Sequence, residues 1–155
     1  MRTFDTLEAL AAAKGDELGA SAWFTITQDR VDEFARATED HQWIHVDKER
    51  AAKGPFGHTI VHGYLTLSLI PFLSSQVFEI TVPGPRINYG VDAVRFPITV
   101  PVGSHVRCVS TLMDVEETSH GHLLTIRNEV EVKLADGLRL PEPACVAETL
   151  VLLPA

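Results

Sequence analysis

The sequence predicts an α+β fold in which an antiparallel β-sheet wraps around one long central helix. Its 155 residues fit one domain, residues 1–155, that can bury a core without disulfide or metal staples. From His62 to about Phe78 the chain is apolar on nearly every side, as expected only of a helix surrounded by protein. One strand pattern precedes this helix and four follow it, which is the order of a single sheet folded around a helix.

The N-terminal segment predicts two helices with a strand between them. Residues 5–15 are typical of a short helix that ends at Gly15, and residues 22–26 predict the first strand. Thr27 is a typical N-cap, because apolar residues follow it at helical spacing as far as about Glu39. A second helix is therefore expected over this stretch.

A flap is expected between this second helix and the central one. Asp40 falls where the second helix ends, and residues 40–55 carry polar side chains around Trp43 and Ile44. Residues 47–53 favour a short helix within the stretch. The flap would lie over the body of the domain.

The central helix and the later strands complete the expected fold. Pro71 should kink the helix, because proline removes the hydrogen bond to the carbonyl of Leu67. Turn residues then separate stretches with strand patterns. Four strands are expected, over residues 86–96, 104–116, 122–133 and 144–153.

Composition excludes several classes of function. The net charge of −8, with no basic stripe, argues against nucleic acid as the main partner. The longest apolar run, Tyr64 to Leu73, is too short and too interrupted to span a membrane. The only cysteines, Cys108 and Cys145, fall in separate expected strands and have no ligand-like spacing, so we expect reduced thiols in a cytoplasmic protein.

Asp40 and His45 are five residues apart and lie just ahead of the central helix. An imidazole has a pKa near working pH and can activate water, while a carboxyl group near an apolar ligand can hold that water and move a proton. The first turn of a helix has unpaired amides, and Gly63 has no side chain to keep a carbonyl away from its own. These parts suit the addition or removal of water beside a carbonyl.

The same residues can also be explained without a catalytic role. An aspartate that ends a helix and a histidine on the next loop are common surface features. His62 fits a supporting place at the helix start better than the role of a base, and Gly63 could serve close helix packing. The pairs His41/His45 and His58/His62 have zinc-like spacing, but neither has the full zinc motif, so no metal is expected.

Two motifs in this chain resemble those of the MaoC-like hydratase/dehydratase family of hot-dog proteins. The family has Gly-Asp-x-Asn-Pro-(Ile/Leu)-His and then Gly-x-(Ile/Val)-(Val/Ala)-His-Gly-(Met/Tyr)-Leu. The chain has Asp40-His41-Gln42-Trp43-Ile44-His45 and then Gly57-His58-Thr59-Ile60-Val61-His62-Gly63-Tyr64-Leu65. Glu39, Gln42 and Trp43 depart from the pattern, in a form similar to the branch of nodulation protein N and its mycobacterial homologues.

The resemblance implies reversible syn hydration of trans-2-enoyl thioesters to (R)-3-hydroxyacyl thioesters, as in fatty-acid metabolism. It implies that Asp40 and His45 share the catalytic water, that the Gly63 amide receives the enolate oxygen, and that His62 is supporting. Other roles are carried over as well: Ser68 would support the aspartate, and substrate contacts would come from Ile60, Val61, Arg86, Asn88 and Tyr89. Coenzyme A would enter only as part of the substrate, with no other cofactor.

Two other functions on the same fold remain open, as does the assembly. A thioesterase would direct water at the carbonyl carbon instead, and the altered turn at Gln42 and Trp43 is compatible with an acyl-binding module that has no activity. The expected fold also leaves a sheet edge and a helix flank uncovered. We therefore expect a homodimer.

Overall fold

The computed structural model describes residues 1–155 and contains one six-stranded sheet with helices on one face. Strand order is β2-β6-β7-β8-β5, with β3 paired to β6, and every pairing is antiparallel. The strands are β2 (Glu17–Ala20), β3 (Phe24–Thr25), β5 (Ile87–Arg95), β6 (His105–Thr118), β7 (Gly121–Lys133) and β8 (Cys145–Pro154). The four long strands expected from the sequence are confirmed.

Burial alternates along these strands and defines two faces of the sheet. On β6, Val106 and Cys108 are buried, whereas Arg107 between them is partly exposed. Because neighbouring side chains of a strand point to opposite faces, one face is packed against the core and the other is solvated. We call these the inner and the outer face.

The central helix lies against the inner face and consists of two short helices, α5 (Gly63–Ser68) and α6 (Ile70–Ser74). Leu65, Leu69 and Leu73 from this segment enter the main hydrophobic cluster together with inner-face residues of β6, β7 and β8. The expectation of one helix from His62 to Phe78 was too long. The helix is interrupted at Leu69, next to the segment in which Pro71 supplies no N–H, and Phe78 lies in a strand.

The expected second helix and the flap are also present. α2 (Gln28–Thr38) begins after Thr27, whose side chain accepts a hydrogen bond from the Arg30 amide, as expected of its N-cap. The flap contains α4 (Lys48–Ala52), which was expected, and α3 (Trp43–Val46), which was not. The Trp43 ring covers Gly54 so closely that a Cβ there would lie 2.8 Å from it.

A second, smaller layer covers the far end of the inner face. It contains α1 (Leu7–Ala12), within the helix expected over residues 5–15, and the parallel pair β1 (Arg2–Phe4) and β4 (Phe78–Ile80). Phe4 and Ile80 bury side chains here beside Leu124 of β7. This pair was not expected, because three-residue strands carry almost no periodic signal.

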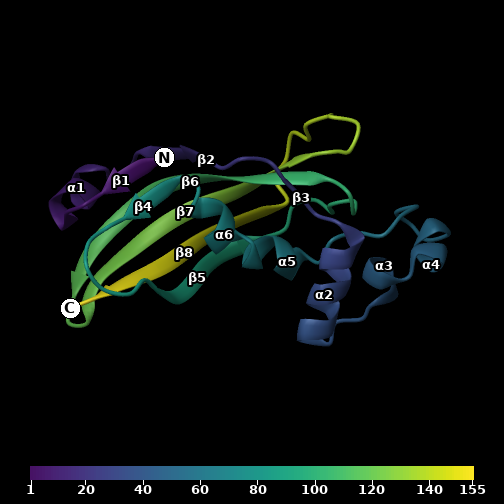
Figure 1. Ribbon diagram of the computed structural model, residues 1–155, viewed down its shortest axis with the longest axis horizontal. Helices are drawn as coiled ribbons and strands as arrows, with labels where there is room; N and C mark the ends of the chain where they lie inside the picture. The colour runs from purple at the N-terminus through teal and green to yellow at the C-terminus, as the bar shows by residue number, and fades with distance from the viewer.

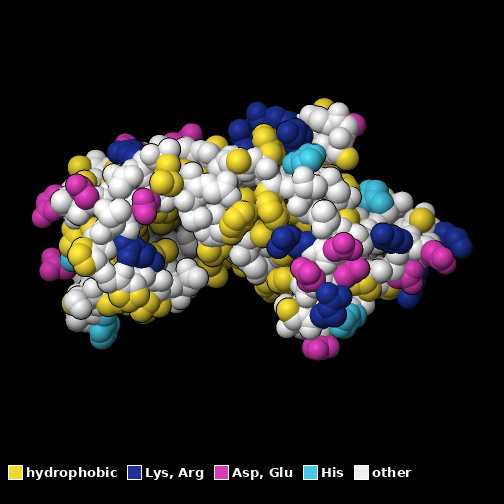
Figure 2. Space-filling model, viewed as in Figure 1, with side chains coloured by type: hydrophobic (Ala, Val, Ile, Leu, Met, Phe, Trp, Pro, Cys, Tyr) yellow, Lys and Arg dark blue, Asp and Glu magenta, His cyan; other side chains and the backbone are white.

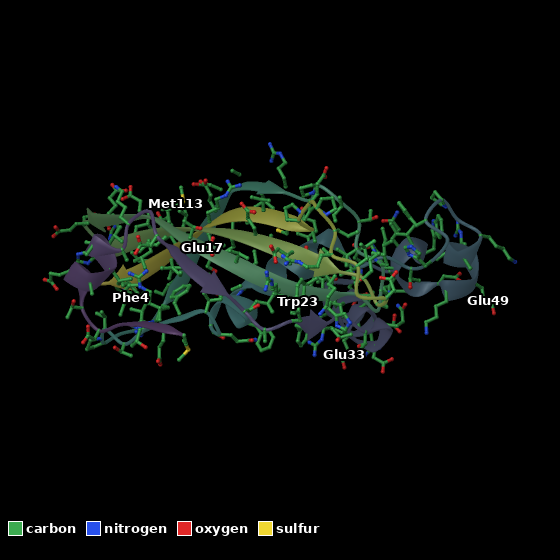
Figure 3. The ribbon with its side chains drawn as sticks, turned by 90° about the horizontal axis from the view of Figure 1, so that it is seen from above. Phe4, Glu17, Trp23, Glu33, Glu49 and Met113 are labelled. Atoms are coloured by element: carbon green, nitrogen blue, oxygen red, sulfur yellow. The ribbon has the colours of Figure 1, made fainter.

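The figures show an elongated arrangement with the flap at one end. In Figure 1, α2, α3 and α4 project beyond the sheet, while α1, β1 and β4 lie toward its other end. The view from above in Figure 3 separates Glu49 of α4 from Phe4 and Glu17 in the same way. No helix has the length and apolar character needed to cross a membrane.

Candidate active site

Two helix ends position Asp40 and His45. The α2 helix stops at Glu39, which adopts a left-handed conformation with φ of 61°. Glycine is favoured in this conformation at a helix end, which explains the Gly of the family pattern. Glu39 is therefore an unusual residue at this position. The chain then turns, with the Asp40 carboxylate accepting a hydrogen bond from the Gln42 amide at 3.3 Å, and places His45 on α3.

The His45 ring is buried and held in one tautomer. Only 6% of the residue is exposed, and its Nδ1 atom lies 2.7 Å from the carbonyl oxygen of Ile60. Because a carbonyl oxygen can only accept, Nδ1 carries the hydrogen and donates it. The neutral ring therefore keeps its lone pair on Nε2, which makes no hydrogen bond within the protein.

His62 packs directly behind His45. The two rings are stacked, with centroids 3.9 Å apart and planes 23° from parallel. The Nε2–H of His62 donates to the backbone carbonyl of Asp40 at 3.0 Å, so His62 holds the chain at the helix end. Its Nδ1 atom is buried without a hydrogen-bond partner. The structure thus places His62 in contact with both predicted catalytic residues.

One polar atom from each of Asp40, His45 and His62 lies within 4.8 Å of the other two. A metal ion fits this set poorly, because imidazole lone pairs lie in the ring plane and stacked rings direct them side by side rather than toward a common point. A water molecule, in contrast, can bridge groups at such a separation with two ordinary hydrogen bonds.

Burial lowers the pKa of His45 below the usual value of 6.5. Removal from water is the largest cause, and the neighbouring His62 ring acts in the same direction; the hydrogen bond to Ile60 and the nearby Asp40 carboxylate oppose it. The imidazole is therefore neutral at neutral pH. A neutral ring with a free Nε2 is the form that can accept a proton from water.

His45 opens into a cavity of about 290 Å³ at the start of α5. Ile60, Val61 and Gly63 line it as well, so these three predicted site residues lie together with His45. The amides of Gly63 and Tyr64 donate no hydrogen bond within the protein. The opposite wall comes from the chain after β5, where the Phe96 ring would lie 3.1 Å from a Cβ at Gly63.

Four predicted residues lie elsewhere. The Ser68 hydroxyl is exposed and donates to the Tyr64 carbonyl in its own helix, so its expected contact with Asp40 is not formed. The Arg86 guanidinium donates to the carbonyls of Ile80, Val82 and Gly84 and closes the loop before β5 instead of facing this cavity.

Asn88 and Arg86 line a different cavity, of about 780 Å³, between α6 and the start of β5. Tyr89 is 61% exposed on β5 and lines neither cavity. The expectation for these residues was wrong, because the cavity next to His45 is lined by the chain that follows β5, from Phe96 onward, and not by β5 itself.

Gln28 and Thr59 support the site and were not expected. The Gln28 amide donates to the carbonyl of His45 at 2.8 Å and accepts from the Thr59 hydroxyl at 2.7 Å. It joins α2, α3 and the segment before α5. A glutamine at the start of a helix has no local sequence signal for contacts so far along the chain.

Comparisons with known proteins agree with this geometry. A family model described as "MaoC like domain" matches residues 9–133. The chain is 51% identical to 3-hydroxyacyl-thioester dehydratase Z of Mycobacterium tuberculosis, with 97% of each chain covered. It is 42% identical to nodulation protein N of Rhizobium leguminosarum bv. viciae, over 90% of this chain and 85% of the other.

A solved structure extends the likeness to three dimensions. The (R)-hydratase from A. caviae, which is involved in PHA biosynthesis, superposes with a TM-score of 0.70 at 26% identity. The match covers 91% of this chain and 96% of the hydratase chain. The two folds are therefore similar over most of both chains.

Proposed function

Because the chain belongs to the MaoC-like domain family, we propose that it is an (R)-specific enoyl-thioester hydratase that also acts in reverse as a 3-hydroxyacyl-thioester dehydratase. The 51% identity to a dehydratase over nearly the full chain supports the reaction class. The observation that carries the mechanism is the free Nε2 atom of a neutral His45, held next to Asp40 in a cavity that opens at a helix start.

His45 and Asp40 would share the reacting water. His45 accepts a proton from the water through Nε2 as the oxygen bonds to the β-carbon of the enoyl thioester. Asp40 holds the same water, and the proton that leaves the water is passed by these two groups to the α-carbon from the same side, so one water is consumed and the addition is syn. The Ile60 carbonyl and the His62 ring keep the His45 ring from rotating during this transfer.

Negative charge would develop on the thioester oxygen between these two steps. The unpaired amide of Gly63 lies in the same cavity as His45 and can donate to that oxygen. No side chain at Gly63 blocks the approach. The arrangement supports Gly63 as the oxyanion donor.

The reaction needs no metal or redox cofactor, and coenzyme A takes part only as the carrier of the acyl group. The poor fit of a metal to the stacked histidines supports this proposal. Dialysis against EDTA should leave the rate of crotonyl-CoA hydration unchanged, and added Zn²⁺ should not raise it. Loss of activity with EDTA and recovery with a metal would contradict the proposal.

The protein would act as a homodimer in the cytoplasm. β5 is an edge strand with exposed apolar side chains at Ile87, Tyr89 and Val91, and a second copy would cover them. Cys108 and Cys145 are both buried free thiols, as is usual in a reducing compartment.

Product analysis tests the proposed reaction. The protein is incubated with crotonyl-CoA, and the loss of enoyl absorbance, the release of free thiol and the chirality of the product are measured. A hydratase gives (R)-3-hydroxybutyryl-CoA without thiol. Thiol release without hydration indicates a thioesterase, and tight binding with no product indicates an acyl-binding module; either result contradicts the proposal.

A further inference from the structure

The cavity next to His45 is closed on one side by Phe96, whose position follows from an irregularity in β5. Asp92 pairs with Glu148, and the next pair is Arg95 with Val146. Two residues of β5 between these pairs, Ala93 and Val94, therefore face one residue of β8. This is a one-residue β-bulge.

The backbone at Ala93 is strained. Its φ of 50° lies in the left-handed region, where glycine is favoured and other residues are uncommon. Residues held in such conformations cluster at functional sites, where the surrounding structure maintains them. A strained residue three positions before a cavity wall therefore suggests a role for the bulge.

The bulge decides which face of the sheet Phe96 occupies. Asp92 and Arg95 are paired with Glu148 and Val146, which both lie on the outer face of β8. Side chains alternate along a strand, so in a regular strand of this same sequence, with no bulge, Phe96 would share the outer face with Asp92. With it, Val94 packs on the main core and Phe96 turns to the inner face.

On the inner face, Phe96 meets the start of α5. Its ring covers Gly63, stands edge-on to Tyr64 with centroids 5.9 Å apart, and lines the same cavity as His45. Figure 1 shows β5 running along the edge of the sheet toward α5. The cavity it bounds, about 290 Å³, is at the small end of the range for ligand pockets.

We propose that Phe96, set on the inner face by the bulge at Ala93, is the specificity-determining wall of the acyl cavity and restricts the enzyme to short enoyl groups. The inference rests on the proposed hydratase function. A large rigid ring beside the oxyanion donor leaves room for the reacting carbons and blocks a long chain. Removing the ring should extend the cavity without touching Asp40 or His45.

The test compares crotonyl-CoA with trans-2-decenoyl-CoA. The wild-type enzyme should have the larger kcat/KM for crotonyl-CoA, and Phe96→Ala should shift the ratio toward decenoyl-CoA by about tenfold or more, as expected for a change of several methylenes in an apolar pocket. Met113→Ala is the control. It removes an exposed apolar side chain of β6 that lines neither cavity, so its ratio should stay within about twofold of wild type.

Binding provides a readout that does not depend on turnover. Calorimetry with butyryl-CoA and decanoyl-CoA should show the same shift in binding preference. Because these ligands are not hydrated, the measurement tests the role of Phe96 even if the protein is not a hydratase. Phe96→Leu replaces Phe96→Ala if the latter does not fold. Equal preference of the wild-type protein for the two chain lengths, an unchanged ratio in the folded Phe96 variant, or no binding of either ligand would overturn the proposal.

Discussion

His45 and His62 show how two similar side chains take different roles from their hydrogen bonds. Each donates one ring N–H to a backbone carbonyl, His45 to Ile60 and His62 to Asp40. The remaining nitrogen of His45 is directed to a cavity, whereas that of His62 is buried without a partner. A buried, unpaired nitrogen costs about 1–3 kcal/mol, so stability alone does not explain His62 at this position.

Removing either predicted proton-transfer group should abolish most turnover. Asp40→Asn and His45→Gln should each lower kcat for crotonyl-CoA by at least about a hundredfold, because general acid–base groups contribute that much. Circular dichroism should show an intact fold in both. His41→Gln is the control, since His41 is exposed beside the site and should be dispensable. Near-wild-type turnover in a variant excludes that residue from the mechanism.

The lowered pKa of His45 predicts two effects of acid. On acidification, kcat/KM should begin to fall only below pH 6.5, because the pKa of His45 in the folded protein lies below that value. The free energy of unfolding should also fall with acid. As the pH drops, the unfolded chain binds a proton on His45 before the folded protein does, so the stabilisation is complete above pH 6.5 and declines as the pH falls toward the folded-state pKa.

Chemical denaturation between pH 5 and pH 8 measures the stability effect. His45→Gln should have a smaller loss of unfolding free energy on acidification than the wild type. An equal loss in the two proteins would mean that His45 is not a buried neutral group.

At the scale of elements, the sequence predicted those strands and helix starts that have a local signal, namely alternating burial or a capping residue. The four long strands and the start of α2 at Thr27 follow from signals within a few residues. The β1–β4 pair and the helix α3 depend on contacts between distant segments and were missed. The bulge at Ala93 was missed as well, because an alanine gives no local signal of a left-handed backbone.

The candidate site divides in the same way. The motifs identified Asp40, His45 and Gly63, which do lie around the start of α5. Ser68 and Arg86 were misplaced because a position within an element does not fix the direction of a side chain. Gln28 and Phe96 reach the site through packing between elements, which no local pattern describes.

The cap of α2 should matter for activity as well as for stability. Thr27→Ala removes the acceptor for the Arg30 amide and should cost about 1 kcal/mol of unfolding free energy. Because α2 carries Gln28 and ends just before Asp40, fraying of the helix should also lower kcat. Thr6→Ala removes the equivalent cap of α1, far from the site, and should lower thermal stability with kcat unchanged. Equal effects of both variants on kcat would contradict this coupling.

At the scale of the whole molecule, charge and apolar surface are distributed differently. Figure 2 shows charged side chains over the end that carries α2, α3 and α4 and also over the opposite end, while hydrophobic side chains are exposed in the middle of the same view. Exposed apolar residues occur on β5 and on the central helices, at Tyr64 and Phe72 among others. The exposed apolar side chains of the edge strand β5 suit it to self-association along that strand.

The exposed edge strand β5 therefore predicts the oligomeric state and a way to disrupt it. Light scattering at micromolar concentration should give twice the chain mass of 17.0 kDa. Val91→Lys places a charge in the middle of the exposed edge strand and should shift the protein toward monomer, because a buried unpaired charge is strongly unfavourable. Met113→Lys changes a comparably exposed apolar residue on β6 and should leave the dimer intact. A monomeric wild-type protein, or equal effects of the two lysines, would mean that β5 is not the interface.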